Sequence, residues 1–405
     1  MEGGYGDDPE IRDQPYRTAR KIKNMGKNPF IPFSRPWIDD TEVEAVSQVL
    51  ASKWISTGNR VREFERAFAE YLGVKHAIAV SSCTAALHLS LVVAGIGNDD
   101  EVITTPYTFT ATAEAIRYVG AKPVFVDIQP DMLNIDTSKI EAAITDRTKA
   151  ILPVHIAGIP CDMDTLQEIC HTHNLTLIDD AAHAIPTEYK GQYIGNIGDL
   201  SAFSFYANKN LTTGEGGMIT TNSDAFAEPL RTMRLHGINK DAWSRQSQRN
   251  IWHYDIATEG YKYNMTDIQA AMGVCQLMKL NKQHERRRNL AHIYQTELAK
   301  FPQIDTPVAP DNPRGHAWHL YIIQLNTGNR DEFVEALREA NIECSVHYIP
   351  LHLFDFYQER YGYRIGDFPC AEAAFERVVS LPLHPGLTEE DIHTVVEAIR
   401  HFFSP

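Results

Sequence analysis

The sequence predicts an α/β protein in which a mostly parallel sheet is sandwiched by helices and is followed by a smaller C-terminal α+β domain. Between Ala77 and Thr221, short runs rich in β-branched residues alternate with segments of helical periodicity, which is the pattern of strands joined by helical crossovers. Residues 266–298 then contain no Pro and a single Gly, which favours long helices. The rest of the chain mixes strand-like and helical segments.

The alternating part supplies the elements of the predicted sheet in chain order. Apolar and β-branched residues that run together predict strands, and apolar residues that recur three or four positions apart predict helices. The predicted order is strand 77–80, helix 84–94, strand 101–105, helix 111–119, strand 122–128, helix 137–144, strand 149–156, helix 163–173 and strand 175–180. Two further runs, 200–205 and 216–221, have no helix between them, so they predict either a hairpin or two neighbouring strands.

The later segments predict a connection and a second domain. An apolar stripe through Ile268, Cys275 and Leu280 predicts one or two long helices that lead out of the sheet domain. Beyond it, an α+β arrangement is indicated by the runs 319–325 and 342–348 and by helices at 331–340 and 389–402. We therefore expect a flexible leader (1–27), a large α/β domain (28–280) and a small α+β domain (281–405).

The overall charge disfavours a nucleic-acid or membrane partner. The 405 residues include 38 basic and 53 acidic ones, a formal net charge of −15, which repels a phosphate backbone or an anionic bilayer. The six cysteines are scattered without a C-x-x-C pair, which fits a reducing cytoplasm better than a disulfide framework or a zinc ribbon. No apolar run has the length of a membrane helix. We expect a cytoplasmic protein without a metal.

A lysine beside a glycine cluster is the first candidate functional feature. The run KNLTTGEGG, Lys209 to Gly217, follows a strand-like segment and holds three glycines in four positions, which permits a close backbone approach to a ligand. It is not a nucleotide-binding P-loop, because the lysine precedes the glycines. Taken alone, a solvated lysine beside a surface turn explains the run better.

Two more features lie at the ends of predicted strands. The run LTLI leads into Asp179 and Asp180, and ligands of α/β sheets bind at the carboxyl ends of parallel strands. In SSCTAAL, Ser81 to Leu87, hydroxyl and small residues open a helix, whose free N–H groups can hold a phosphate. Each feature alone is explained as well by ordinary capping.

Together the three features match the requirements of pyridoxal 5′-phosphate (PLP). A lysine binds the cofactor covalently, a carboxylate keeps the pyridine nitrogen protonated, and a helix start holds the phosphate. An aromatic ring is also expected beside the cofactor, and Phe109 follows the strand 101–105 at the same sheet edge. We therefore expect PLP, bound covalently to Lys209.

The sequence resembles the DegT-type family of sugar aminotransferases, which belongs to the fold-type I PLP-dependent enzymes. The resemblance covers the chain from about Phe30 onward, and it is carried by the ordered blocks AVSSCTAALHLSL, DEVITTPYTFTATA, PVHIAG, IDDAAHA, FSFYANKNLTTGEGGMI, GYKYNMTDIQAAMG, AWHLY and VHYIPLH. It implies the PLP-dependent transferase fold, with PLP bound by the large domain. It also implies a homodimer whose active sites lie at the subunit interface.

The resemblance assigns roles residue by residue. Lys209 matches the lysine that binds the cofactor, Asp180 matches the carboxylate that faces the pyridine nitrogen, and His183 matches a position near the phenolic oxygen; these are the expected catalytic residues. Further cofactor ligands are expected at the phosphate (Thr84, Ala85 and Ser204), on the ring face (Phe109) and, from the other subunit, at the phosphate again (Asn264). Family members often have Glu where Asp179 stands.

The substrate class follows from the same resemblance. The segment GYKYNMTD, with PFSRP and the His of DAAHA, is most similar to enzymes that aminate the 4-keto group of a nucleotide-linked sugar, such as UDP-4-amino-4-deoxy-L-arabinose aminotransferase. This implies L-glutamate as the amino donor and a role in amino-sugar or surface-polysaccharide biosynthesis. The acidic substrate needs local positive charge, for which the candidates are Arg35, Lys53, Arg60 and Arg234.

Three alternatives are weaker. PLP-dependent sugar dehydratases of this fold carry His at the lysine position, so Lys209 disfavours that activity. A regulatory protein without turnover is disfavoured because Lys209, Asp180 and Ser204 are all present. A zinc site on His171, His173 and His183 is disfavoured because the first two lie two positions apart on a predicted helix and do not share a face.

Overall fold

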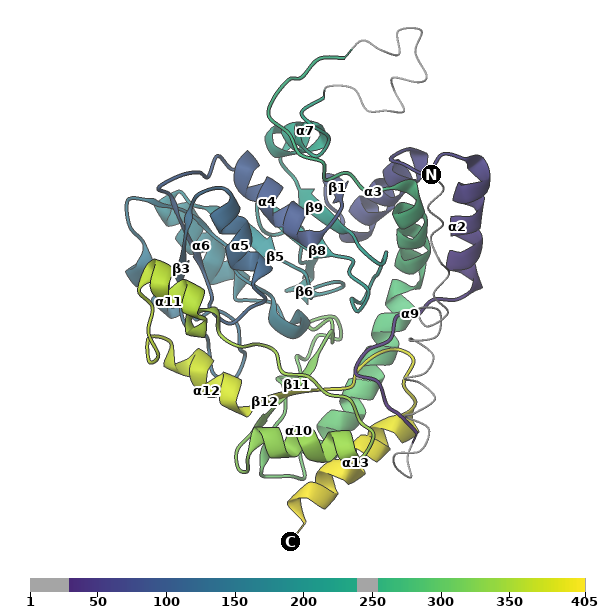
Figure 1. Cartoon of the computed structure of the whole chain (residues 1–405), viewed down its shortest axis with the longest axis vertical. Helices are drawn as coiled ribbons and strands as arrows, with labels where there is room; N and C mark the ends of the chain where they lie inside the picture. The colour runs from purple at the N-terminus through teal and green to yellow at the C-terminus, as the bar shows by residue number, and fades with distance from the viewer. Residues whose placement is uncertain (1–28, 239–253, 405) are drawn as a thin grey trace, which may run out of the picture.

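The computed structural model describes residues 29–238 and 254–404, which form a large sheet with flanking helices and a smaller sheet with its own helices (Figure 1). The predicted leader, 1–27, lies outside the described residues. In Figure 1 the large sheet occupies the upper half and the small sheet the lower half, with the long helix α9 beside both. No helix of the described residues is both long and apolar enough to cross a membrane.

The large sheet has seven strands in the order β1-β9-β8-β5-β4-β2-β3. Its strands are β1 His76–Val80, β2 Glu101–Thr104, β3 Lys122–Phe125, β4 Thr148–Ile151, β5 Thr176–Asp180, β8 Leu200–Ser204 and β9 Gly217–Thr221. The pairs from β8 through β5, β4 and β2 to β3 are parallel, whereas β9 runs antiparallel to both β1 and β8. The predicted mostly parallel sheet is therefore confirmed, and 200–205 and 216–221 form neighbouring antiparallel strands.

Helices cover both faces of this sheet. Successive strand residues point to opposite faces, and in β1 Ile78 packs into one core cluster while Ala79 packs into the other. The first cluster is closed by α4 Cys83–Val93, α5 Ala111–Tyr118 and α7 Asp224–Met233, and the second by α3 Asn59–Leu72, α6 Met163–His173 and the first half of α9 Asp267–Leu298. Both faces are buried, which explains the continuously apolar strands.

The small sheet contains three antiparallel strands. They are β10 Ile304–Asp305, β11 Tyr321–Leu325 and β12 Val378–Leu381, and α10 Arg330–Glu339, α13 Glu389–Phe403 and the second half of α9 pack on them. The remaining elements are α2 Asp40–Ser52, the hairpin β6 Glu188–Tyr189 and β7 Gln192–Tyr193, α11 Asp355–Tyr361, α12 Pro369–Arg377, and the 3₁₀ turns η4 Ile156–Gly158 and η5 Leu351–Leu353.

Two predicted segments take a different form. Residues 137–144 make two 3₁₀ turns, η2 Thr137–Lys139 and η3 Glu141–Ala143, instead of an α-helix. The side chain of Asp136 caps their start by accepting from the backbone N–H and the hydroxyl of Ser138. The backbone becomes extended at Ile144, so the segment ends after so few residues that an α-helix gains little. The run 342–348 makes only isolated bridges, one of them between Ser345 and Ser380 of β12.

Helix α9 joins the two parts of the molecule without a break. It begins at a capping box in which Thr266 and Gln269 satisfy each other's backbone N–H groups. Gly273 lets it approach α3, since a Cβ there would lie 2.7 Å from the ring of Phe64. The helix has 32 residues, and the predicted domain boundary at 280/281 falls inside it, so one continuous helix packs into both hydrophobic cores.

Candidate active site

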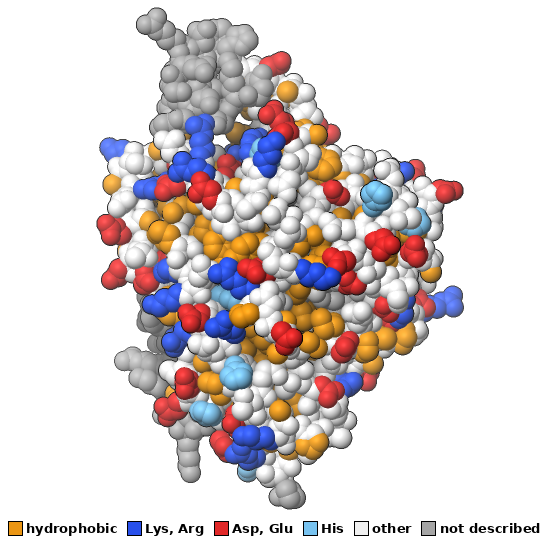
Figure 2. Space-filling model, turned by 180° about the vertical axis from the view of Figure 1, so that it is seen from behind, with side chains coloured by type: hydrophobic (Ala, Val, Ile, Leu, Met, Phe, Trp, Pro, Cys, Tyr) orange, Lys and Arg blue, Asp and Glu red, His pale blue; other side chains and the backbone are white. Residues whose placement is uncertain are grey.

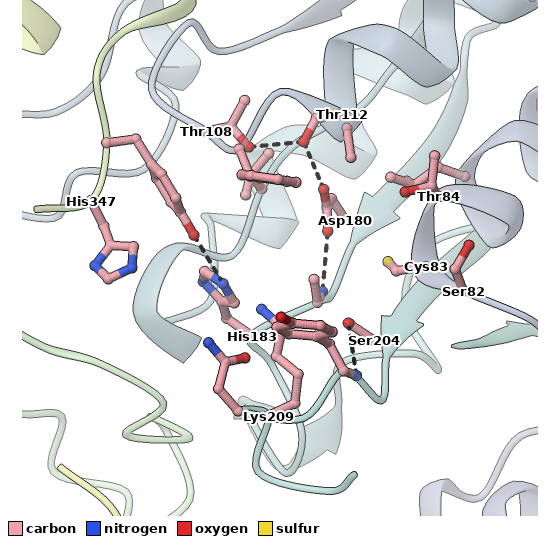
Figure 3. Close-up of a pocket in the computed structure, with 18 of the residues that line it drawn as sticks. Ser82, Cys83, Thr84, Thr108, Thr112, Asp180, His183, Ser204, Lys209 and His347 are labelled. Carbon is pink, nitrogen blue, oxygen red and sulfur yellow. Dashed lines mark hydrogen bonds between the residues drawn. The ribbon is translucent and has the colours of Figure 1, made fainter. Parts of the chain in front are cut away.

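A pocket of about 550 Å³ lies along the carboxyl edge of the large sheet (Figure 3). Its walls come from the segments that follow four of the strands: the start of α4 after β1, residues 108–112 after β2, Val154 after β4 and Asp180 at the end of β5. Strand β8 contributes Ser204 at its end and Lys209 in the following turn. This is the edge at which α/β sheets bind ligands.

Asp180 is a buried carboxylate held by two hydrogen bonds. Its Oδ2 accepts from Thr112 Oγ1 at 2.8 Å, and its Oδ1 accepts from the backbone N–H of Ala182 at 3.1 Å. Because Thr112 gives its proton to the carboxylate, it accepts from Thr108, whose hydroxyl is 2.8 Å away (Figure 3). Burial raises the pKa of Asp180, and the hydrogen bonds and the nearby Lys209 oppose that shift.

Lys209 sits in the turn after β8, where its backbone N–H donates to the carbonyl of Tyr206 at 3.0 Å. Part of the residue is exposed, but the amine is enclosed by the pocket. Burial lowers the pKa of this amine to about 8, while Cys83 and Asp180 act in the opposite direction. A substantial fraction of the amine is therefore neutral near physiological pH, as a base or a nucleophile requires.

The start of α4 forms the far end of the pocket. Ser82 is the N-cap of this helix, and its Oγ accepts from the backbone N–H of Ala85 at 3.1 Å. Thr84 and Cys83 line the pocket, whereas Ala85 does not, since its N–H is directed to Ser82. On the other side, a Cβ on Gly217 would lie 2.5 Å from the carbonyl of Ser82, so only glycine allows this approach.

Neutral histidines and a tyrosine close the opposite wall. His183 Nε2 lies 3.4 Å from the hydroxyl of Tyr348, and the ring of His183 lies 4.4 Å from that of His319. Burial lowers the pKa of His183 and of His319, and the positive charge of Lys209 adds to the effect. His347, whose Nδ1 is 2.8 Å from Ser380 Oγ, has its pKa lowered to about 4 for the same reasons.

The residues of this pocket fit PLP. Two buried polar atoms on its wall have no hydrogen-bond partner among the described residues: Nδ1 of His183 and Oδ1 of Asn208. Unpaired buried polar atoms are costly unless a ligand satisfies them. A carboxylate, a lysine with a lowered pKa and a helix N-terminus with hydroxyls face the same space, and these are the groups that a pyridinium, an aldehyde and a phosphate need.

The structure brings most of the predicted site residues together. Those that line the pocket are Thr84, Phe109, Asp180, His183, Ser204 and Lys209. Asn264 lies outside it, where its Nδ2 donates to Thr57 Oγ1 at 2.6 Å. None of the four predicted basic residues lines the pocket; Arg234 pairs with Glu65, and Arg60 pairs with Glu63 at 2.8 Å.

Several lining residues were not predicted as site residues. Thr112, Asn208, His347 and Tyr348 line the pocket, and the last two belong to the block VHYIPLH, whose two aromatic side chains were the available signal. The described residues contain no group of three His, Cys, Asp or Glu side chains that could hold a metal ion, so the zinc alternative gains no support. His173 instead lies 3.1 Å from Glu141.

A protein family, a protein of known sequence and a solved structure are similar to this chain over most of its length. The DegT/DnrJ/EryC1/StrS aminotransferase family matches residues 36–400. The spore coat polysaccharide biosynthesis protein SpsC of Bacillus subtilis is 48% identical over 379 residues, or 92% of this chain and 97% of SpsC. The putative sugar aminotransferase Spr1654 from Streptococcus pneumoniae, in its PMP-form, has a TM-score of 0.87 and 36% identity over 92% of this chain and 98% of that one; it is also known in a PLP-form.

A further solved structure extends this set. PseC from Helicobacter pylori, an aminotransferase involved in the biosynthesis of pseudoaminic acid, has a TM-score of 0.85 and 31% identity, and the match covers 93% of this chain and 99% of PseC. The family match, from residue 36 to residue 400, includes the large sheet, the small sheet and every residue of the pocket.

Proposed function

Because the chain belongs to the DegT/DnrJ/EryC1/StrS aminotransferase family and is a PLP-dependent sugar aminotransferase, we propose that it moves an amino group from L-glutamate to the 4-keto group of a nucleotide-linked sugar. The predicted family, fold class and enzyme class are confirmed by the matches. The observation that carries the proposal is that Lys209, Asp180 and the start of α4 face one pocket. When bound, PLP supplies an electron sink for the carbanion that forms at the donor Cα.

Lys209 is the residue that moves protons in the proposed reaction. It would bind the cofactor covalently at rest. Its freed amine would take the proton from the Cα of glutamate in the first half-reaction and deliver a proton to the former keto carbon of the sugar in the second. An amine can act as both base and acid only when its pKa lies near the working pH. Burial lowers the pKa of Lys209 to about 8, which supports this role.

Asp180 and its partners hold the ring nitrogen in the proposed complex. A carboxylate opposite a pyridine nitrogen keeps that nitrogen protonated, which strengthens the electron sink. Thr112 and the backbone of Ala182 fix both oxygens of Asp180. The hydroxyl of Ser204 and the N-terminus of α4, with Thr84, would hold the phosphate, while Phe109 would cover one face of the ring.

A second copy of the chain completes the proposed site. Apart from Lys209, no lysine or arginine of the described residues lines the pocket, although the phosphate and the nucleotide are both anionic. Large apolar side chains are exposed at its mouth: Phe109 is 61% exposed and Tyr206 is 49% exposed. Figure 2 shows hydrophobic side chains gathered across the middle of one face of the molecule, as expected for an interface. In a homodimer, we expect Asn264 to contact the phosphate of the PLP that is bound to the partner subunit.

The substrate class and the cellular setting belong to the same proposal. SpsC is named for spore coat polysaccharide biosynthesis and PseC for pseudoaminic acid biosynthesis, which supports a role in surface-polysaccharide or amino-sugar synthesis. Such sugars are carried as nucleotide diphosphates. Because Arg35, Lys53, Arg60 and Arg234 do not line the pocket of their own subunit, they are candidate contacts only if the second copy brings them to it. Nucleotide sugars are cytoplasmic, and we place the enzyme there.

Product identification tests the proposal. The purified protein is incubated with L-glutamate and a panel of UDP-, dTDP- and GDP-linked 3-keto and 4-keto sugars, with Lys209→Ala as the control. We expect a 4-amino sugar and 2-oxoglutarate from the wild type and neither from the variant. Amination at C3, or turnover by Lys209→Ala, contradicts the proposal; a visible absorbance band that the variant lacks would support covalent binding at Lys209.

A further inference from the structure

Tyr348 of the small domain is the only described hydrogen-bond partner of the His183 side chain. The distance from Tyr348 Oη to His183 Nε2 is 3.4 Å, and the other ring nitrogen of His183, Nδ1, is buried without a partner among the described residues (Figure 3). Tyr348 belongs to the segment between α10 and η5, whereas His183 follows β5 of the large sheet. The hydrogen bond between Tyr348 and His183 therefore affects which ring nitrogen of His183 carries the proton.

The hydrogen-bond inventory decides which partner donates. A neutral imidazole carries one proton, on either nitrogen, and His183 is neutral because burial and Lys209 lower its pKa. Burial raises the pKa of Tyr348, so its phenol keeps its proton. Nε2 of His183 is the one acceptor that the described residues offer to this phenol. Tyr348 therefore donates, Nε2 accepts, and the proton of His183 lies on Nδ1.

The neighbouring ring of His319 does not donate a hydrogen bond to His183. The Nδ2 group of Asn210 donates to the carbonyls of Ile185 and Ala317, at 3.1 and 2.8 Å, which turns its Oδ1 toward His319. His319 Nδ1 lies 3.3 Å from that oxygen and must carry the proton. The proton of His319 is thus directed to Asn210 and not to His183, which leaves Tyr348 as the group that sets the tautomer of His183.

In this tautomer the Nδ1–H of His183 is a buried donor that has no acceptor among the described residues. We propose that Tyr348 is a positioning residue whose phenol holds His183 in the Nδ1–H form, so that this N–H donates to the phenolic oxygen of the cofactor. The inference rests on the proposed function, and the place of that oxygen beside His183 is what the family resemblance implies. Without the phenol, the imidazole protonates either nitrogen, and the form with Nε2–H presents a lone pair where the cofactor needs a donor.

A double-mutant cycle on cofactor binding tests the inference. The apparent dissociation constant for PLP is measured on the full chain, without any sugar or amino donor, for the wild type, Tyr348→Phe, His183→Gln and the double variant. We expect Tyr348→Phe to weaken PLP binding about fivefold to tenfold, the loss of roughly one hydrogen bond. A glutamine amide carries its donor in every form, so we expect no further loss when Tyr348→Phe is added to His183→Gln.

The control is Tyr294→Phe, which removes another buried phenol. Its hydroxyl donates to the carbonyl of Pro382 at 3.1 Å and Tyr294 does not line the pocket, so the affinity for PLP should stay unchanged. ¹⁵N NMR of the side chains provides a second readout: the His183 signals of the wild type should show Nδ1 protonated, and those of Tyr348→Phe should show a mixture of tautomers.

Equal losses from Tyr348→Phe in the wild type and in the His183→Gln variant, or no loss at all, overturn the inference and leave the proposed function standing. A wild-type chain that does not bind PLP overturns both. If the cycle gives the expected coupling but no sugar of the panel is aminated, the proposed substrate is wrong and the role of Tyr348 stands.

Discussion

The amine of Lys209 makes the stability of the protein depend on pH. Its pKa falls from 10.5 in the unfolded chain to about 8 in the folded one because of burial. Between these values the unfolded chain binds a proton that the folded chain has lost, so this residue makes the free energy of unfolding rise with pH from about 8 to 10.5. Below pH 8 the folded state carries the full cost of a buried charge.

Lys209→Met should remove that cost. Without PLP, we expect the variant to be more stable than the wild type at pH 7, by as much as about 3 kcal/mol, and the difference to shrink toward zero by about pH 10.5. Urea unfolding of both proteins at about pH 7 and about pH 10 measures it. The same difference at both pH values would show that packing, and not the charge, is responsible.

Thr112 should matter for catalysis through Asp180. It donates to Asp180 Oδ2 at 2.8 Å and so opposes the rise in pKa that burial causes. Thr112→Val leaves the carboxylate with the N–H of Ala182 alone, and we expect kcat for the half-reaction with glutamate to fall about tenfold. Thr112→Ser keeps the hydroxyl and should retain most of the activity; if both variants lose it equally, the methyl group is what matters.

At this scale the sequence predicted the residues whose chemistry is visible in the chain itself. Lys209 beside glycines and Asp180 after an apolar strand could be found because each stands in a local pattern. The block VHYIPLH drew attention to Tyr348, but its contact with His183 could not be predicted, because the two residues are 165 positions apart and the contact depends on how the C-terminal part of the chain packs. The role of Thr112 could not be predicted either. Its partner Asp180 is 68 positions away, and a threonine near a helix start usually only caps the helix.

Among the elements, helix α4 combines a cap with a binding function. Ser82→Ala removes the N-cap hydrogen bond to Ala85, and we expect a loss of about 1 kcal/mol of stability together with weaker binding of PLP, since the same turn faces the phosphate. Thr388→Ala is the matched control: Thr388 caps α13 through Asp391, and neither residue lines the pocket. It should lower the melting temperature similarly and leave PLP affinity unchanged.

The elements that sequence periodicity located are those with long, regular patterns. The strands of the large sheet and the helices α4, α6, α9, α10 and α13 lie within a few residues of their predicted ranges. The segment 137–144 has the composition of a helix, but its backbone becomes extended at Ile144, so too few residues follow the cap at Asp136 to propagate an α-helix. The strand β12 was missed because its four residues carry no periodic signal of their own.

For the whole molecule, subunit complementation tests whether the site is shared. If Asn264 acts in the partner's pocket, mixed dimers of Asn264→Ala and Lys209→Ala contain one complete site, with Lys209 from one subunit and Asn264 from the other. Random exchange of equal amounts should therefore restore about a quarter of wild-type activity from two inactive proteins. Native mass spectrometry checks that mixed dimers form; mixed dimers without activity would place Asn264 in its own subunit's site.

Helix α9 also decides how the molecule comes apart. Its first half buries Ala270, Leu277 and Leu280 in the core of the large domain, and its second half buries Leu290 and Tyr294 in the core of the small one. Both hydrophobic cores include residues of α9, so when one core melts and its half of α9 unfolds, the other core loses part of its packing. The two domains should behave as a single cooperative unit, with one calorimetric transition where a chain of two linked domains would show two.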